Sequence, residues 1–484
     1  MADILVTGAT VITMDPSRRV IEDGAVAIDG DRIAGVGARA EIEGAHSAPA
    51  VIDARKMVCL PGLVDVHGHA GHALVKTMDH DSFARWRETV ELIYAEGTDE
   101  EFWHAEASLA ALERLKFGTT CGLSYFGGGR MLIRTDDPVY AERHCEAVEA
   151  VGIREVLAVG PCSPPFPRRF ARWDADGKHE HVADFDRQMA TAEEIVNRWN
   201  GGAEGRMRIC LTSSTMNVTR APYAGLPIAD LQAEARAVRD LADRLGVLLT
   251  QDGHTTGTIA FAHKELGILG PDVILSHSVG LTDEEIAICA ETDTKIAHNP
   301  SSPNSYPSRC PVPQLLDAGV TVALGSDAAS PDMNYDMFRH MYSCMRQHRA
   351  QFGEGAYIPP GKALEMATID GARALGMDSE IGSLEPGKKA DLILLDMDKP
   401  HLYPLNMPVH RITNFAGGQD VDTVIVDGKV LMEGRVVKTV DESEVLTRAQ
   451  RATETMLERT GLQSSLEMGE GFWGKSRYPR AWDG

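Results

Sequence analysis

Short segments at both ends of the chain alternate hydrophobic and polar residues with a period of two. Between residues 3 and 58, strand-like runs are separated by turn sequences at the spacing of a β meander. The same pattern returns between residues 390 and 432, where Asp427-Gly428 predicts a hairpin turn. Neither end makes a stable sheet alone, so we expect both ends to pair into one composite β-sandwich domain.

In the middle of the chain, short apolar runs alternate with longer segments of helical periodicity. This alternation predicts βα units with parallel strands, in the α/β class. Helices are expected at 101–115, 186–199 and 229–245, and an amphipathic helix at 441–462. Eight strands favour a closed (β/α)8 barrel of the TIM type. The predicted strands are 63–66, 119–123, 154–159, 208–211, 247–250, 273–275, 295–297 and 321–324.

The patterns divide the chain into four parts. The length of 484 residues exceeds a typical single domain, which agrees with a large barrel plus a smaller domain. We predict the first part of the β-sandwich at 1–58, the barrel at 59–381, the second part of the β-sandwich at 382–440, and a C-terminal helix and tail at 441–484.

The net charge of −23 disfavours nucleic acid and anionic membranes as partners, because both require a basic surface. No apolar run approaches the roughly 20 residues of a membrane span, and no basic signal-peptide start is visible. The eight cysteines form no Cys-x-x-Cys motif, which is typical of a reducing compartment. We expect a cytoplasmic homodimer or larger homo-oligomer that acts on a small molecule.

Two histidines follow the first predicted barrel strand. His67 and His69 are two residues apart, so both side chains point to the same face of the strand. Two imidazoles that converge in this way can hold a divalent metal ion. The pair therefore predicts a metal site.

Polar residues also follow the last four predicted strands. The carboxyl-terminal strand ends of a barrel carry its active site. Several histidines and a carboxylate there predict metal-assisted hydrolysis, in which the ion lowers the pKa of water and a nearby base takes its proton. The residues are Gln251, His254, His277, His298, Asn299 and Asp327.

Four of these residues have both an expected role and a structural alternative. Asp327 could be both metal ligand and proton acceptor, or simply a helix N-cap. His277 could donate to a developing oxyanion or a ring nitrogen, or serve as a structural histidine. His298 and Asn299 are expected to line the substrate pocket, with Trp86 as an apolar wall, although all three could be structural.

Five segments resemble the amidohydrolase superfamily, and within it the branch of triazine hydrolases, chlorohydrolases and aminohydrolases. The resemblance implies a (β/α)8 barrel with a composite β-sandwich and one divalent metal, Zn²⁺ first, with Fe²⁺ or Co²⁺ as alternatives. It also implies hydrolytic deamination, dechlorination or amide cleavage. The segments are 61–69, 275–284, 297–302, 324–330 and 382–392.

The end of the fifth strand departs from the pattern of that branch. The branch carries His-x-x-Glu there, with His as metal ligand and Glu as proton shuttle, whereas this chain reads Gln251-Asp-Gly-His254. Either His254 binds the metal, or Gln251 takes the ligand position and His254 the shuttle position. An amide oxygen is a weaker zinc ligand than an imidazole, so we expect His67, His69, His254 and Asp327 as the ligands.

Together these features predict a metal-dependent amidohydrolase that cleaves a C–N bond, or a related C–Cl, urea, carbamate or thiocarbamate bond. The substrate would be a small non-peptide molecule, heterocyclic or N-substituted. One alternative is a purine or pterin deaminase, which the missing Glu weakens. Another is a catalytically inactive barrel that acts as a scaffold.

Overall fold

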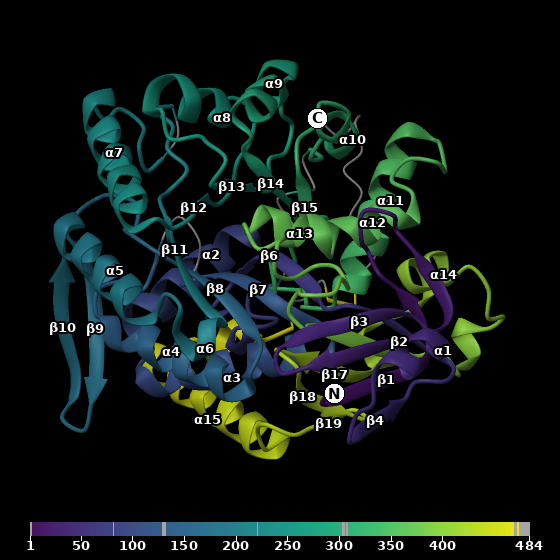
Figure 1. Ribbon diagram of the computed structural model, residues 1–484. Coiled ribbons are helices and arrows are strands. Elements are labelled where there is room, and N and C mark those ends of the chain that lie inside the picture. The colour runs from purple at the N-terminus through teal and green to yellow at the C-terminus, as the bar shows by residue number, and fades with distance from the viewer. Residues whose placement is uncertain are drawn as a thin grey trace.

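The computed structural model contains an eight-stranded parallel barrel and a separate nine-stranded sheet (Figure 1). This arrangement confirms the predicted α/β class, the (β/α)8 barrel and the β domain built from both chain ends. The three boundaries between the four predicted parts stay a prediction. Parts of the predicted tail, 469–471 and 474–484, lie outside the described residues. The structure describes residues 2–80, 82–127, 132–219, 221–302, 305, 308–468 and 472–473.

The barrel strands are buried along almost their whole length, as expected for parallel strands that are covered on both faces. All eight overlap the predicted ranges. The barrel closes through main-chain bonds from Asp327 N to His67 O (2.9 Å) and from His69 N to Ala328 O (3.3 Å). In spatial order the strands are β6 (Leu63–His69), β7 (Thr119–Tyr125), β8 (Arg154–Val159), β11 (Met207–Thr212), β12 (Leu249–Gln251), β13 (Val273–Ser276), β14 (Lys295–His298) and β15 (Val322–Leu324).

Helices between the strands cover the outside of the barrel (Figure 1). In α7 (Ile228–Leu245), buried Leu231, Ala235, Val238 and Leu241 recur every three or four residues and face the barrel. The other predicted helices are α3 (Glu100–Lys116), α5 (Phe185–Trp199) and α15 (Glu442–Thr460). The remaining α-helices are α1 (Arg39–Ala45), α2 (Phe83–Leu92), α4 (Pro138–Val151), α6 (Gly202–Gly205), α8 (Thr258–Phe261), α9 (Asp283–Thr292), α10 (Val312–Asp317), α11 (Met337–Phe352), α12 (Pro360–Met366), α13 (Ile369–Ala374) and α14 (Pro408–Phe415).

A two-stranded hairpin that the sequence analysis did not predict lies between β8 and α5. It consists of β9 (Arg168–Asp174) and β10 (Gly177–Ala183), which pair in antiparallel register. Among the described residues, no helix is both long enough and apolar enough to cross a membrane.

Strand β5 (Met57–Pro61) joins the two chain ends within the nine-stranded sheet. It runs antiparallel to β16 (Leu392–Asp396), with Cys59 opposite Leu394, and parallel to β1 (Ile4–Ile12). The buried apolar side chains of this sheet form a core cluster of their own. The other strands are β2 (Val20–Asp29), β3 (Arg32–Ala38), β4 (Ala50–Asp53), β17 (Val421–Val426), β18 (Lys429–Glu433) and β19 (Val436–Val437).

A buried ion-pair group connects the barrel to this sheet. Arg154, the first residue of β8, donates from Nε to Asp391 Oδ2 (2.6 Å) and from Nη2 to Asp391 Oδ1 (3.1 Å), and it also pairs with Asp427. Removing one partner of such a buried pair typically costs about 3–5 kcal/mol. The group therefore fixes the β domain beneath the amino-terminal end of the barrel, opposite the predicted active site.

Candidate metal centre

Histidines and carboxylates from four strand ends meet at the carboxyl-terminal end of the barrel. His67 and His69 end β6, while Asp252, His277 and Asp327 follow β12, β13 and β15. Their ligand atoms form two overlapping groups whose members lie within 4.8 Å of one another. One group is His67, His69 and Asp327, and the other is His67, Asp252 and His277. We refer to these five residues as the first cluster.

The two carboxylates of the first cluster lie between the three imidazoles. Asp327 Oδ1 is 3.2 Å from His67 Nε2 and 3.1 Å from His69 Nε2. Asp252 Oδ1 is 3.0 Å from His277 Nε2 and 3.4 Å from His67 Nε2. Imidazole nitrogens and carboxylate oxygens thus converge at one buried position, which is the donor set of a divalent transition-metal site.

Charges within the first cluster outweigh the effect of burial. Burial favours the neutral acid, but the neighbouring imidazoles of His277 and His67 hold the pKa of Asp327 well below its usual range. The pKa of Asp252 is lowered for the same reason, with His277 as its main partner. Burial lowers the pKa of His277, but Asp327 and Asp252 outweigh this effect and raise it. Both carboxylates are therefore ionised beside the imidazoles.

Asp65 of β6 connects the first barrel strand to the loop that carries Asp327. Asp65 Oδ1 accepts a hydrogen bond from Ser326 N (2.8 Å), and Oδ2 accepts bonds from Ser326 Oγ (2.7 Å) and Arg114 Nη2 (3.1 Å). Asp327 has a φ of +55°, a conformation that is uncommon for residues with a side chain. The bonds to Asp65 hold this conformation, so Asp327 is fixed beside His67.

The second ring nitrogen of His69 has the contact expected of a histidine ligand, whereas His67 Nδ1 is buried without a hydrogen-bond partner among the described residues. His69 Nδ1 lies 3.0 Å from Gly127 O, to which it can donate. That bond leaves Nε2 free of its proton and directed into the first cluster, which is the usual arrangement of a histidine ligand. The Tyr125 ring packs 5.0 Å from the ring of His67 and restricts its orientation.

The end of β12 places Asp252 in the first cluster. Thr250 faces the barrel interior, where its Oγ1 lies 2.7 Å from Tyr125 Oη. Asp252 is two residues further on and faces the same side, because side chains alternate along a strand. The sequence analysis missed Asp252, although this alternation was a signal that could have identified it.

Gln251 and His254, the two residues considered at this position, lie in other contacts. Gln251 Nε2 donates to Ser213 Oγ (2.9 Å), on the opposite side of β12 from Asp252. His254 Nε2 lies 3.1 Å from Gln251 Oε1, and His254 Nδ1 lies 3.0 Å from Thr258 Oγ1. Within the described part of the chain, the groups of histidine, cysteine and carboxylate side chains with metal-ligand spacing include Asp252 and do not include His254.

Two of the predicted substrate-pocket residues border the first cluster. Asn299 Nδ2 lies 3.4 Å from His277 Nδ1. The Trp86 ring lies 5.5 Å from the ring of His72, which in turn lies 4.5 Å from the ring of His69. His72 is fully buried and was not singled out from the sequence. Burial holds the pKa of His72 well below its usual range, so this imidazole is neutral.

The third predicted pocket residue, His298, points away from the first cluster. It is adjacent to Asn299, and neighbouring residues of a strand face opposite sides. The His298 ring lies 5.5 Å from the ring of His348 on α11. His298 therefore lies between the barrel wall and a surrounding helix.

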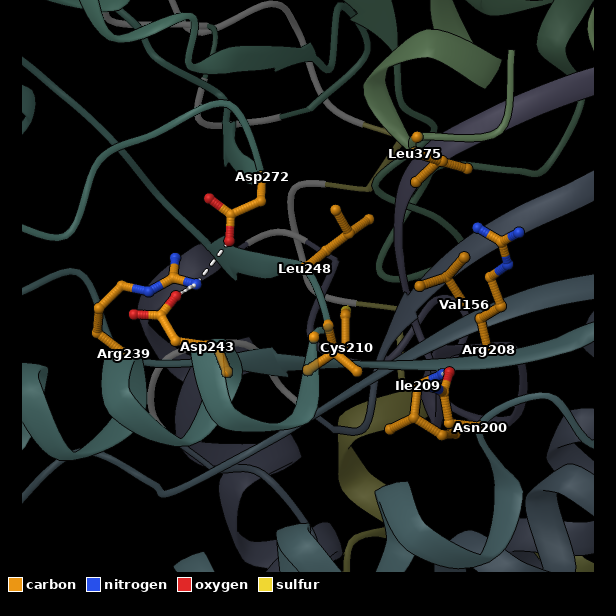
Figure 2. Close-up of a pocket in the computed structure, with 14 residues that line it drawn as sticks. Val156, Asn200, Arg208, Ile209, Cys210, Arg239, Asp243, Leu248, Asp272 and Leu375 are labelled. Carbon is orange, nitrogen blue, oxygen red and sulfur yellow. Dashed lines mark hydrogen bonds and ion pairs between the residues drawn. The ribbon is translucent and has the colours of Figure 1, made fainter. Parts of the chain in front are cut away.

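A pocket of about 510 Å³ lies at the opposite, amino-terminal end of the barrel strands (Figure 2). Arg208, Leu248 and Asp272 line it, and Arg239 bridges Asp243 and Asp272 across one wall. No residue of the first cluster lines this pocket. This separation agrees with the location of barrel chemistry at the carboxyl-terminal strand ends.

Comparison with known proteins gives relatives over almost the whole chain. The profile of the family described as "Amidohydrolase family" matches residues 58–431. The 5'-deoxyadenosine deaminase of Methanosarcina mazei is 32% identical over 475 residues, which cover 95% of this chain and 99% of that protein. The 5-methylthioadenosine/S-adenosylhomocysteine deaminase of Moorella thermoacetica is 33% identical over 458 residues, which cover 92% and 97%.

Solved structures share the fold at lower sequence identity. An adenosine deaminase from Xanthomonas campestris with bound zinc aligns with a TM-score of 0.81 and 23% identity, over 94% of this chain and 99% of that chain. The atrazine chlorohydrolase of Arthrobacter aurescens in complex with zinc aligns with a TM-score of 0.77 and 23% identity, over 93% and 100%. Both structural alignments support the assignment of the fold as a barrel with an additional sheet.

Proposed function

The chain belongs to the amidohydrolase family, and from this premise we propose how its first cluster acts. As a member of the family, the protein is a metal-dependent hydrolase of carbon–nitrogen bonds other than peptide bonds. The observation that carries the proposal is the convergence of imidazoles and ionised carboxylates at the carboxyl-terminal end of the barrel. We propose that Zn²⁺ is the ion held there.

We assign His67, His69, Asp252 and Asp327 as the metal ligands. Asp252 takes the strand-five position for which we had expected His254, with Gln251 as the alternative. The support is geometric, because Asp252 Oδ1 is 3.4 Å from His67 Nε2. A carboxylate is also an ordinary zinc ligand, in contrast to an amide oxygen.

The roles of the protein groups follow from their charge states. A divalent ion supplies a Lewis acid that polarises the substrate and lowers the pKa of water. Asp327 accepts the proton of the attacking water at Oδ2, because its Oδ1 already faces His67 and His69. His277, whose pKa is raised by the two carboxylates, donates to the oxygen or nitrogen on which negative charge develops. Asn299 lies against His277 Nδ1 and holds the ring in place.

The substrate that we propose is a small heterocyclic or N-substituted molecule from which an amine is released. The altered strand-five sequence supports an amine other than that of an ordinary aromatic deamination, because the branch uses Glu where this chain has His254. A second candidate is deamination of an adenine nucleoside. The names of the relatives, which are 5'-deoxyadenosine and 5-methylthioadenosine deaminases, favour it.

One experiment separates these candidates. The metal-free protein is loaded with Zn²⁺ and incubated with 5'-deoxyadenosine, 5'-methylthioadenosine and N-alkylamino-triazines, while ammonia, alkylamine and chloride are measured. We expect turnover that a chelator abolishes and Zn²⁺ restores. Ammonia from the nucleosides selects the deaminase, and alkylamine selects the first candidate. A protein that retains well under one equivalent of added metal would instead be the inactive scaffold.

We also propose that the protein assembles as a cytoplasmic homo-oligomer. Apolar side chains near the C-terminus, Leu466, Met468, Phe472 and Trp473, are exposed in the single chain, which supports an interface there. The eight cysteines are all buried as free thiols, which supports a reducing compartment. Light scattering of the purified protein measures the oligomeric state, and a monomeric mass would contradict the interface.

A further inference from the structure

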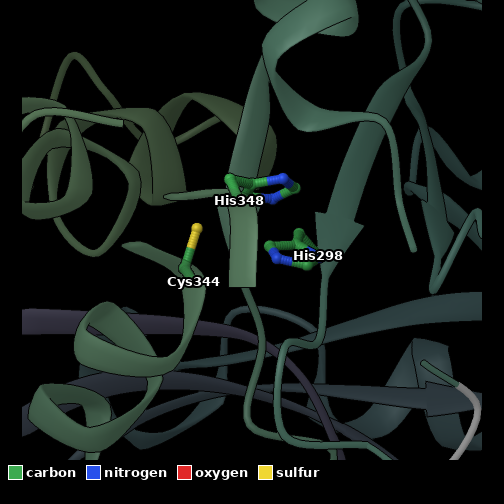
Figure 3. Close-up of side chains that lie close together, drawn as sticks. All are labelled: His298, Cys344 and His348. Atoms are coloured by element: carbon green, nitrogen blue, oxygen red, sulfur yellow. The ribbon is translucent and has the colours of Figure 1, made fainter. Parts of the chain in front are cut away.

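A second group of potential metal ligands lies between the barrel and α11. His298 ends β14, and Cys344 and His348 are four residues apart on α11, which places them on one face of the helix. Figure 3 shows the three side chains together, one from the strand and two from the helix. Their ligand atoms lie within 4.8 Å of one another. We refer to these three residues as the second cluster.

The second cluster is fully buried and its histidines are unpaired. His298, Cys344 and His348 are each 0% exposed. Neither ring nitrogen of His298 or of His348 has a hydrogen-bond partner among the described residues. Each unpaired buried polar group costs about 1–3 kcal/mol, so four such nitrogens require an explanation.

Packing alone does not account for these residues. Leucine or methionine would fill the same space between β14 and α11 without unpaired nitrogen atoms. A metal ion uses one lone pair of each imidazole together with the sulfur of Cys344, so it gives one nitrogen of each unpaired histidine a partner. The pairing of nitrogen and sulfur donors in one enclosed site is characteristic of metal-binding proteins.

The protonation states are suitable for metal binding. Burial, together with the charge of Arg309, lowers the pKa of His348 to about 4. Burial also holds the pKa of His298 well below its usual range. Both imidazoles are therefore neutral, which is the form that binds metals. Burial raises the pKa of the Cys344 thiol to about 12, and a coordinated metal removes that proton.

We infer that His298, Cys344 and His348 bind a thiophilic transition-metal ion, Zn²⁺ or Cu⁺, at a site separate from the first cluster. The absence of a carboxylate from this group disfavours Mg²⁺ and Ca²⁺, which take oxygen ligands, and the thiol favours a softer ion. On binding, the S–H bond of Cys344 breaks, a metal–sulfur bond forms, and the proton passes to solvent without a change of oxidation state.

The position of the second cluster gives this ion a structural role. Binding would tie α11 to the end of β14, where the next residue, Asn299, lies against His277 of the first cluster. The inference does not rest on the proposed function, because it uses only the chemistry of the three ligands.

The test is a titration of the metal-free full-length protein with Co²⁺, which substitutes for Zn²⁺ and reports thiolate ligation by a near-ultraviolet charge-transfer band. We expect the band in the wild-type protein and its loss in Cys344→Ser, with total Co²⁺ binding reduced by one equivalent. His67→Ala serves as the matched control and should keep the band, since it alters only the first cluster. Circular dichroism establishes that each variant is folded.

Cu⁺ is tested in parallel, without oxygen, by competition against a coloured chelator. Binding of one equivalent that depends on Cys344 supports the copper form of the site, even without a Co²⁺ band. His348→Gln provides a second variant if Cys344→Ser does not fold. The inference is overturned if wild-type protein shows neither response, or if both Cys344→Ser and His348→Gln retain it.

Discussion

The two clusters lie on opposite sides of the end of β14, and their surroundings differ in charge. Asn299 faces the first cluster, where two carboxylates accompany three histidines. His298 faces the second cluster, where a thiol accompanies two histidines and the group has no carboxylate. The pKa of His277 in the first cluster is raised by Asp327 and Asp252, whereas burial lowers the pKa of His348 to about 4.

The surroundings of a histidine decide what a metal ion bound to it can do. The first cluster contains ionised carboxylates that can move protons, so it is suited to hydrolysis. The second cluster has no proton acceptor other than its own ligands, so it is suited to holding a helix against the barrel. The first three predictions below test this contrast, and the last compares the carboxylates of the first cluster with one that has no histidine beside it among the described residues.

The largest effect is expected from Asp327→Asn. The amide keeps the size of the side chain but loses the charge and the proton acceptor, so kcat/KM should fall by at least ~10³-fold, which is about 4 kcal/mol. Metal content measured by mass spectrometry should fall as well. The exposed Asp317→Asn is the matched control and should change neither quantity. If Asp327→Asn kept its activity, the proposed role of Asp327 as proton acceptor would be wrong.

The next effect separates Asp252 from His254. If Asp252 is the strand-five ligand, Asp252→Ala should weaken Zn²⁺ binding by about 100-fold, in the range of a lost ligand or its support. His254→Ala should weaken it by less than about tenfold, because His254 contacts Gln251 and Thr258. Competition with a zinc-binding dye measures both. If His254→Ala weakened Zn²⁺ binding more than Asp252→Ala did, His254 would be the strand-five ligand.

Much of this arrangement could be predicted from the sequence, because the periodicity is local. All eight barrel strands overlap the expected ranges, since each is a short apolar run between helical segments. The spacing of His67 and His69 predicts a shared direction, and the structure brings them together with His277 and Asp327. The location of barrel active sites at the carboxyl-terminal strand ends therefore identifies His67, His69, His277 and Asp327 from the sequence.

The parts that could not be predicted depend on register or on contacts between distant elements. Asp252 and Gln251 are neighbours, and the twofold alternation of β12 places only one of them toward the first cluster, but the register that selects Asp252 is fixed only in the folded barrel. Cys344 and His348 carry no strand-end signal, because they belong to a helix whose packing against β14 is set by the whole barrel. Sequence spacing therefore shows their shared helix face but not their contact with His298.

An apolar substitution in the second cluster should not destabilise the metal-free protein, whereas substitutions in the first cluster are expected to cause losses of activity and metal binding. In metal-free protein, His348→Leu removes unpaired buried nitrogens, so the free energy of unfolding should stay equal or rise by up to about 2 kcal/mol. Added Zn²⁺ or Cu⁺ should then stabilise the wild type more than the variant. Urea unfolding, with exposed His410→Leu as control, measures both. A destabilised metal-free variant would mean that His348 has a structural partner in place of a metal.

The smallest effect is expected for Glu234, a half-buried carboxylate on α7. The pKa of Asp327 is lowered by neighbouring imidazoles, whereas no cation of the described residues offsets the burial of Glu234. Burial and the nearby Asp230 raise the pKa of Glu234 from 4.5 to about 7. Between these values the folded protein binds more protons than the unfolded chain, so this residue reduces stability as the pH rises.

Glu234→Gln removes that penalty and should stabilise the protein at pH 8 by about 1 kcal/mol, a value reduced for partial exposure to solvent. At pH 4 the carboxyl group is mostly neutral in both states, so the difference should become small. Urea unfolding at the two pH values measures it. Equal gains in stability at both pH values would show that the charge of the Glu234 carboxylate is not the cause. Glu234 would then not differ from the carboxylates of the first cluster in the way its raised pKa indicates.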